Sequence, residues 1–299
     1  MVLIAEGRYL AQAQPAGLCE ELRGRGIAVE VVDPEAPAPG AIDSCDPGWI
    51  DGADGCVARG RSDAVLAALE EAERRGVPVL NPARSIRRVV DKAAMGCELA
   101  GAGVPTPPTW TGDAADLVDS VPTSEYPVIA KPAFGDNCRG VQVCGAPAEL
   151  AALASGDEAR TGIRPDETIL VQPYLPSDGF DLKLYGAGRR AWAVRKPSPM
   201  AESAAGARPY PLALSPALCS LTQRCGEIFD LDLWGVDCIE TPAGPLVIEV
   251  NEYPNYTGVG GASGVIADLL LARARATRPV GASQRRSPVL SRMASGVTR

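Results

Sequence analysis

The chain has 299 residues, of which 46% are hydrophobic and 22% are charged. This length suggests about two domains, and the composition excludes disorder for most of the chain. No apolar run reaches the roughly 18 residues that a membrane-spanning helix needs, and the first residues lack the basic start of a signal peptide. The sequence therefore predicts a cytoplasmic protein with no membrane partner.

Histidine is absent from the chain, which excludes Ser–His and Cys–His catalysis and every histidine metal site. The nine cysteines form no Cys-x-x-Cys pair, so we expect reduced, mostly buried thiols. The net charge is −8, and the last 24 residues carry five arginines and no acid. Setting these five charges aside leaves −13 for the rest, which argues against a nucleic-acid partner.

Lysine is rare, since only four of the 29 basic residues are lysines: Lys92, Lys131, Lys183 and Lys196. Arginine has replaced lysine nearly everywhere that a surface charge would do. Positions that keep lysine are therefore candidates for a compact point charge on a flexible stem. The alternative is four leftover surface lysines.

The first part of the chain alternates strand-like and helical patterns. Short apolar runs occur at residues 2–5, 28–32, 54–58 and 76–80, and residues 62–75 have apolar side chains at helical spacing. This alternation predicts a small parallel α/β domain that ends near Asn81.

From residue 81 onward the pattern becomes irregular. We expect one helix over 85–102 that carries Lys92, and further helices at 146–154, 215–229 and 262–275. The expected strands are 126–131, 140–144, 168–172, 181–187 and 190–195, followed by a hairpin over 235–251. This mixture is typical of an α+β region. The tail from residue 276 lacks apolar periodicity, so we expect it to be disordered.

The hairpin at 235–251 indicates a metal site. If residues 242–244 form its loop, Asp237 lies opposite Glu249, and Asn251 shares their face. A bulge at the loop glycine would shift this register by one residue. Facing carboxylates repel unless a cation neutralises them, and an Asp/Glu/Asn set suits Mg²⁺ (or Mn²⁺). The alternative is an accidental pairing with one carboxylate in solvent.

A second candidate segment follows Lys131, which ends a predicted strand. The loop at 133–140 contains Gly135 and Gly140, and such a loop can fold over phosphates and offer backbone N–H groups. It is not a Walker motif, and taken alone it could be a simple turn.

The strand end at Gln172, Pro173 and Tyr174 is a third candidate. The carbonyl of Pro173 and the N–H of Tyr174 could pair with a purine edge. Taken alone, these residues favour the simpler interpretation of a strand that runs into a loop.

In chain order, these features resemble the ATP-grasp superfamily, and most closely its RimK-like branch of carboxylate–amine ligases. The resemblance covers roughly residues 81–275, and the motifs that carry it are Asn81, Asp91-Lys92, Tyr126-Pro-Val-Ile-Ala-Lys131-Pro, the 133–140 loop, Gln172-Pro-Tyr-Leu, Asp181-x-Lys183-x-Tyr185-x-x-Gly188, Gly235-x-Asp237 and Glu249-x-Asn251-x-x-Pro254. It implies an α/β plus α+β architecture in which two lobes sandwich ATP. The implied parts are a pre-ATP-grasp domain (1–85), a central lobe (86–174), a C-terminal lobe with the metal site (175–275) and the basic tail (276–299).

The resemblance also implies roles for individual residues. The implied ATP-binding residues are Lys92 and Lys131 (phosphates), Gly135 and Gly140 (phosphate cover), Gln172, Pro173 and Tyr174 (adenine hinge) and Asp181 (ribose). The implied metal ligands are Asp237, Glu249 and Asn251, and the implied catalytic residues are Lys183 and Arg195.

The activity implied by the resemblance is ATP-dependent amide formation from a small-molecule or peptide carboxylate and an amine, through an acylphosphate. Lys183 stands where such ligases usually have arginine, and Arg195-Lys-Pro-Ser-Pro-Met replaces their polar Arg-x-Asn segment. The alternative is therefore a kinase similar to the ATP-grasp inositol polyphosphate kinases, which the acidic charge disfavours. A non-catalytic ATP-binding scaffold and a homo-oligomer also stay open, whereas the missing Gly-x-Gly-x-x-Gly excludes a Rossmann enzyme.

Overall fold

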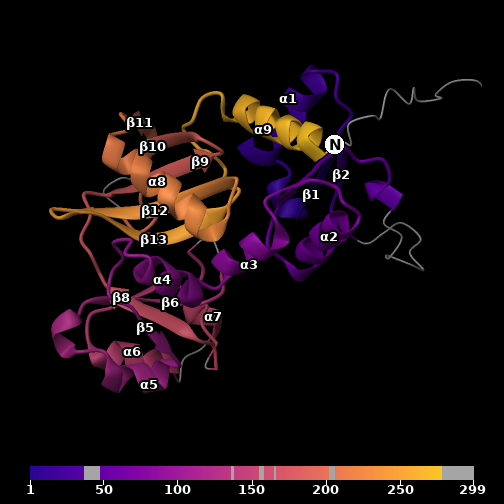
Figure 1. Ribbon diagram of the computed structural model, residues 1–299. Coiled ribbons are helices and arrows are strands. Elements are labelled where there is room, and N and C mark those ends of the chain that lie inside the picture. Colours follow the sequence, from indigo (N-terminus) through magenta and orange to yellow (C-terminus); the bar gives the residue numbers. More distant parts are fainter. Residues whose placement is uncertain (37–47, 136–137, 155–157, 165, 202–205, 278–299) are drawn as a thin grey trace, which may run out of the picture.

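The computed structural model describes residues 1–36, 48–135, 138–154, 158–164, 166–201 and 206–277. These residues form three separate β-sheets, each covered by helices (Figure 1). Within the described ranges, every helix is too short or too polar to cross a membrane. The expected disorder of the tail concerns residues that lie almost entirely outside these ranges.

The first sheet is the predicted parallel α/β unit. Its strands run in the order β2 (Glu30–Val32), β1 (Val2–Ala5), β3 (Cys56–Arg59) and β4 (Val79–Leu80). All residues of β1 and β3 are buried, as expected for a parallel sheet covered on both faces. The helices are α1 (Ala13–Gly24) and α2 (Asp63–Arg74), with short 3₁₀ turns η1 (Gly7–Tyr9) and η2 (Gly48–Ile50).

The single helix expected over 85–102 is wrong, because the chain leaves the helical conformation at Asp91 (φ −84°, ψ 105°). Two helices result, α3 (Ala83–Val90) and α4 (Lys92–Gly101). The Asp91 carboxylate accepts hydrogen bonds from the backbone N–H of Ala93 (2.8 Å) and Ala94 (3.1 Å), which is an N-cap. Lys92 is therefore the first residue of α4 and projects from its N-terminal end.

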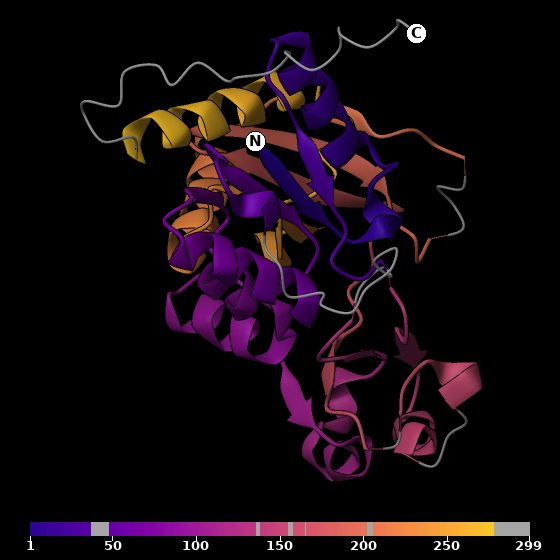
Figure 2. The same cartoon turned by 90° about the vertical axis from the view of Figure 1, so that its right-hand side faces the viewer.

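A small antiparallel sheet forms the second unit. Its strands run in the order β5 (Trp110–Gly112), β8 (Ile169–Pro173), β6 (Val128–Pro132) and β7 (Gln142–Cys144). The helices α5 (Ala114–Ser120), α6 (Pro147–Ala154) and α7 (Glu158–Thr161) and the turn η3 (Thr123–Glu125) complete it. This unit lies at one end of the molecule (Figure 2).

The third sheet is antiparallel and larger. Its strands run in the order β11 (Tyr210–Leu212), β10 (Arg190–Pro197), β9 (Phe180–Ala187), β12 (Leu233–Thr241) and β13 (Gly244–Glu252). One face packs on α8 (Pro216–Phe229) and on apolar side chains of α3 and α4. Helix α9 (Ala262–Thr277) lies beside α1 instead (Figures 1 and 2), so the end of the described chain joins the first sheet to the third.

The hairpin register agrees with the prediction at its functional position, because Asp237 pairs with Glu249. The loop itself is shorter than predicted, since Thr241 pairs with Gly244. A bulge between Asp237 and Cys238, at the level of Ile248, restores the one-residue difference. Two local deviations thus cancel, and the two carboxylates face each other.

Candidate active site

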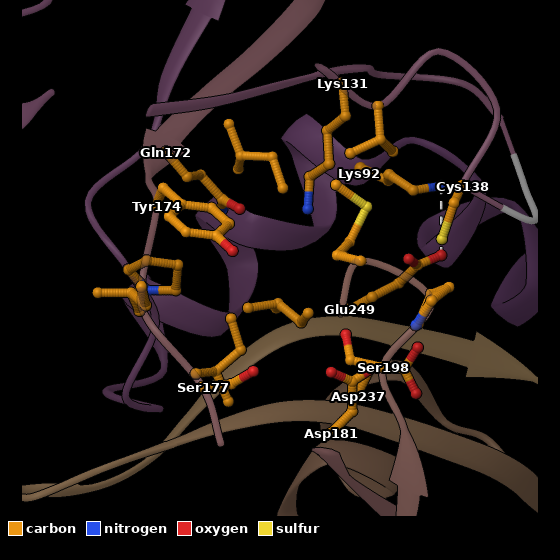
Figure 3. A pocket seen from close by; sticks show the side chains of 18 of the residues that line it. Lys92, Lys131, Cys138, Gln172, Tyr174, Ser177, Asp181, Ser198, Asp237 and Glu249 are labelled. Atoms are coloured by element: carbon orange, nitrogen blue, oxygen red, sulfur yellow. Dashed lines mark ion pairs between the residues drawn. The ribbon is translucent and has the colours of Figure 1, made fainter. Parts of the chain in front are cut away.

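A pocket lies between the small and the large antiparallel sheets, and α4 closes one side (Figure 3). The structure brings most of the predicted site residues together along its walls. These are Lys92, Lys131, Gly135, Gln172, Pro173, Tyr174, Asp181, Lys183, Asp237 and Glu249. Figure 3 shows Lys131 pointing into the pocket from one wall, with Asp181, Asp237 and Glu249 on the facing wall. The remaining predicted residues, Gly140, Arg195 and Asn251, are not among the lining residues.

The large sheet contributes the carboxylates of Asp181 and Asp237 to the pocket, and one lysine contacts both of them. Lys183 Nζ lies 3.0 Å from Asp237 Oδ2 and 3.3 Å from Asp181 Oδ2. Lys183 pairs with Asp237 across β9 and β12, so their side chains share one face. Burial alone would lower the pKa of Lys183, but the two carboxylates outweigh it and raise this pKa. Lys183 therefore stays protonated and offsets one of the two negative charges.

Two further lysines come from the opposite side. Lys92 is buried, its Nζ lies 3.2 Å from Glu249 Oε1, and it donates a hydrogen bond to the carbonyl of Gly135. Lys131 projects from β6, and none of the ion pairs found within the described part of the chain includes it. Burial lowers the pKa of Lys131, although nearby Glu249 acts in the opposite direction. Lys131 is thus a half-buried cation that an anion in the pocket would stabilise.

The predicted purine hinge is only partly available. The N–H of Tyr174 donates to the carbonyl of Pro127 at 2.8 Å, so the sheet already occupies that donor. Leu175, the next residue, also lines the pocket. The side chain of Gln172 is buried and donates to Thr109 Oγ1 at 2.9 Å, which makes it an anchor of the strand end.

Arg195 lies on the face of the large sheet that points away from the pocket. It pairs with Leu182 across β9 and β10, whereas the lining residues Asp181 and Lys183 occupy the alternate positions. Its guanidinium lies 2.6 Å from Asp178 Oδ1 and 3.1 Å from Glu240 Oε2. In this conformation Arg195 cannot reach the pocket.

Gly140 and Asn251 have other surroundings. Gly140 has φ +73°, and a Cβ there would lie 2.8 Å from the carbonyl oxygen of Gly162, so its role is to allow a tight turn. Asn251 accepts a hydrogen bond on Oδ1 from Arg61 Nη2 at 3.1 Å. Residues 136–137 of the predicted phosphate loop lie outside the described ranges.

The sequence assigned no role to several of the lining residues, among them Ile129, Val141, Ser177, Ile239 and Ile248. The apolar members make part of the pocket suitable for a flat ring. Strand alternation from Asp237 would have identified Ile239. Ile248 had no such signal, because it reaches the pocket only through the bulge.

The carboxylates of Asp237 and Glu249 offer oxygen ligands that suit a hard dication. Asp237 and Glu249 are directly opposed, and both line the pocket. In the structure a lysine neutralises each of them. No group of three or more acidic or thiol side chains in the described residues closes around a single point. This arrangement fits an open Mg²⁺ site, in which water and phosphate oxygens complete the coordination.

Comparisons with known proteins agree with this geometry. A model of the RimK-like ATP-grasp domain matches residues 91–274. A probable alpha-L-glutamate ligase from Aeromonas salmonicida (strain A449) is 29% identical over 208 residues, which cover 66% of the chain and 67% of the relative. A probable alpha-L-glutamate ligase from Thioalkalivibrio sulfidiphilus (strain HL-EbGR7) is also 29% identical, over 207 residues that cover 67% of each protein.

Solved structures show the same fold. D-cycloserine synthetase DcsG superposes with a TM-score of 0.71 at 21% identity, over 91% of the chain and 99% of that structure. A RimK domain protein from Sphaerobacter thermophilus DSM 20745 superposes with a TM-score of 0.66 at 22% identity, over 91% and 100%. The ATP-grasp architecture predicted from the motifs is therefore confirmed. The glutamate-ligase relatives favour ligation over the kinase alternative. Because the family model spans more than half of the chain, the protein belongs to the RimK-like ATP-grasp family and is an ATP-dependent carboxylate–amine ligase.

Proposed function

We propose that the pocket binds MgATP and that ligation takes place at its acidic end. The observation that carries this proposal is the convergence of three lysines on two opposed carboxylates, because this set matches a polyphosphate with its metal. The lysines are Lys92, Lys131 and Lys183. The free cysteines agree with a reducing, cytoplasmic location.

The adenine ring would lie among the apolar lining residues. The carbonyl of Pro173 accepts from the adenine amino group, and the N–H of Leu175 takes the donor role that Tyr174 cannot fill. Lys92 and Lys131 then hold the phosphates. Lys131 gains most from this contact, because a phosphate supplies the countercharge for its half-buried side chain, whose pKa burial lowers.

Asp237 and Glu249 would hold the metal, and Asn251 would join them after a rotation of its side chain. Bound Mg²⁺ neutralises phosphate charge and makes the terminal phosphorus more electrophilic. Lys183 would then share Asp237 with the metal while it keeps its contact with Asp181, and its ammonium group would contact the transferring phosphoryl group. This gives Lys183 the electrostatic role that arginine has in related ligases.

The reaction has two steps. A substrate carboxylate oxygen attacks the terminal phosphorus of ATP, the bond to ADP breaks, and an acylphosphate forms. The amine nitrogen then attacks the acyl carbon, phosphate leaves, and an amide forms after loss of a proton to phosphate or water. No histidine is needed, because positioning and charge stabilisation dominate such chemistry. The carboxylate and amine are small molecules or peptide termini, and glutamate is the first amine to test, given the names of the relatives.

The metal and ATP assignments are tested by Glu249→Gln, with Glu240→Gln as the matched control on the far face of the same sheet. Isothermal titration with ATP and Mg²⁺ should show affinity lost or greatly weakened in Glu249→Gln and kept in Glu240→Gln. Unchanged ATP affinity in a folded Glu249→Gln protein would overturn the metal assignment.

A further inference from the structure

Arg61 connects the first sheet to the strand that carries the proposed metal ligands. It follows β3, yet its Nη2 lies 3.1 Å from Asn251 Oδ1 and 3.2 Å from Glu252 Oε2, at the end of β13. The side chain of Arg61 is 14% exposed and that of Glu252 only 1%. This contact is mostly desolvated, which strengthens its electrostatics relative to a surface pair.

Hydrogen bonds to the buried carboxylate of Glu6 hold the backbone around Arg61 in place. The N–H groups of Arg61 and Ser62 donate to Glu6 Oε1 at 2.8 and 3.2 Å, and Glu6 is buried. Gly60 has φ +140°, and a Cβ there would lie 2.6 Å from the same carboxylate. The loop therefore delivers the guanidinium to a fixed position at the end of β13.

Each proposed metal ligand is thus contacted by a cation of the chain. Lys183 contacts Asp237, Lys92 contacts Glu249, and Arg61 contacts Asn251. The first two contacts are ion pairs, in which the ligand itself carries the countercharge. Asn251 is neutral, so the charge of Arg61 is balanced by Glu252 and not by the ligand.

A dication on Asn251 Oδ1 would lie close to the guanidinium that now donates to this oxygen, and like charges at that distance repel strongly. Glu252 can keep the guanidinium through its own ion pair when Asn251 leaves. Asn251 Oδ1 can therefore change its partner while the buried Arg61 guanidinium stays paired with Glu252.

We propose that Arg61 is a positioning residue of the metal centre: it holds Asn251 in a resting orientation, and Asn251 Oδ1 exchanges Arg61 for the metal while Glu252 retains the guanidinium. This inference rests on the proposed metal site. Metal binding at the end of β13 would therefore change the contacts of Arg61, which lies in the loop after strand β3 of the first sheet.

The test uses Mn²⁺ as the probe, with free Mn²⁺ measured by electron paramagnetic resonance in the presence of ADP. Arg61→Met removes the competitor, so the Mn²⁺ dissociation constant should fall about tenfold, as expected for one charge-assisted hydrogen bond. Glu252→Gln removes the group that retains the guanidinium, so the same constant should rise. A merely structural contact would weaken Mn²⁺ binding in both variants, and an unchanged or weaker affinity in Arg61→Met would overturn the proposal.

Two more variants complete the test. The double variant Arg61→Met/Glu252→Gln removes the guanidinium and its Glu252 partner together, so neither is left buried without the other. It should bind Mn²⁺ more tightly than the unaltered protein, and a weaker affinity in the folded variant would contradict the exchange. Glu249→Gln distinguishes the metal assignment from the exchange proposed for Asn251. If Mn²⁺ binding does not depend on Glu249, the metal site itself is misassigned; if it depends on Glu249 but not on Arg61, only the exchange fails.

Discussion

Replacing Lys131 by methionine should stabilise the protein and at the same time abolish tight ATP binding. Methionine keeps the apolar stem of the side chain and removes the ammonium group, whose pKa burial lowers. None of the ion pairs among the described residues offsets the charge of Lys131. The lysine is therefore retained at a cost to stability, which is the behaviour expected of a functional group.

The size of the effect follows from burial. Removing a half-buried charge that lacks a close partner should raise the free energy of unfolding by about 1–2 kcal/mol, or Tm by roughly 2–3 °C for a protein of this size. A lowered pKa in the folded state means that the unfolded chain binds more protons, so the stability of the unaltered protein rises with pH. The advantage of Lys131→Met should therefore shrink as the pH approaches 10.5, the ordinary value for lysine.

The assay is thermal unfolding without nucleotide, at neutral pH and at a pH closer to 10.5, with ATP affinity measured by isothermal titration. Lys92→Met is the matched control. Lys92 is ion-paired with Glu249 and bonded to Gly135, so its loss should lower Tm and not raise it. A Tm decrease in Lys131→Met, or a gain that grows with pH, would refute the reasoning.

Two further predictions concern other parts of the fold. Asn81 is fully buried, accepts hydrogen bonds from the N–H groups of Asp232 (2.7 Å) and Leu233 (2.8 Å) and donates one to the Leu233 carbonyl. Asn81→Ala should therefore lower the free energy of unfolding, measured by urea denaturation, by about 2–4 kcal/mol. A loss smaller than the error of the method would contradict this. Lys183→Met should lower Tm in the absence of metal, because Asp237 loses its countercharge. Saturating Mn²⁺ should restore more stability to this variant than to the unaltered protein, and equal gains by thermal unfolding would argue against a shared site.

The sequence predicted the facing carboxylates well, because the short loop of a hairpin leaves few possible registers. The agreement at Asp237 and Glu249 nevertheless depends on a shorter loop and a bulge that cancel. Asp91 could have been recognised as an N-cap from its residue type, and this would have divided the predicted helix before Lys92.

The turn between β9 and β10 decides the face on which Arg195 lies, and the expected strands 181–187 and 190–195 already left two residues for this turn. Arg190 pairs with Ala187 across a two-residue turn, which places Lys196, and not Arg195, opposite Asp181. A turn longer by one residue would have reversed this. The contact between Arg61 and Asn251 joins residues 190 positions apart, and no local pattern in the sequence indicates it.

The most direct test of ligase activity is the product balance with ATP and Mg²⁺. Purified protein is incubated first with pooled amino acids and dipeptides, then with pooled polyols and sugar phosphates, and ADP, free phosphate and product mass are measured together. We expect ADP and phosphate in equal amounts, and a product lighter than its two precursors by one water molecule. ADP without free phosphate, together with an acceptor that has gained a phosphoryl group, would contradict the ligase assignment and identify a kinase.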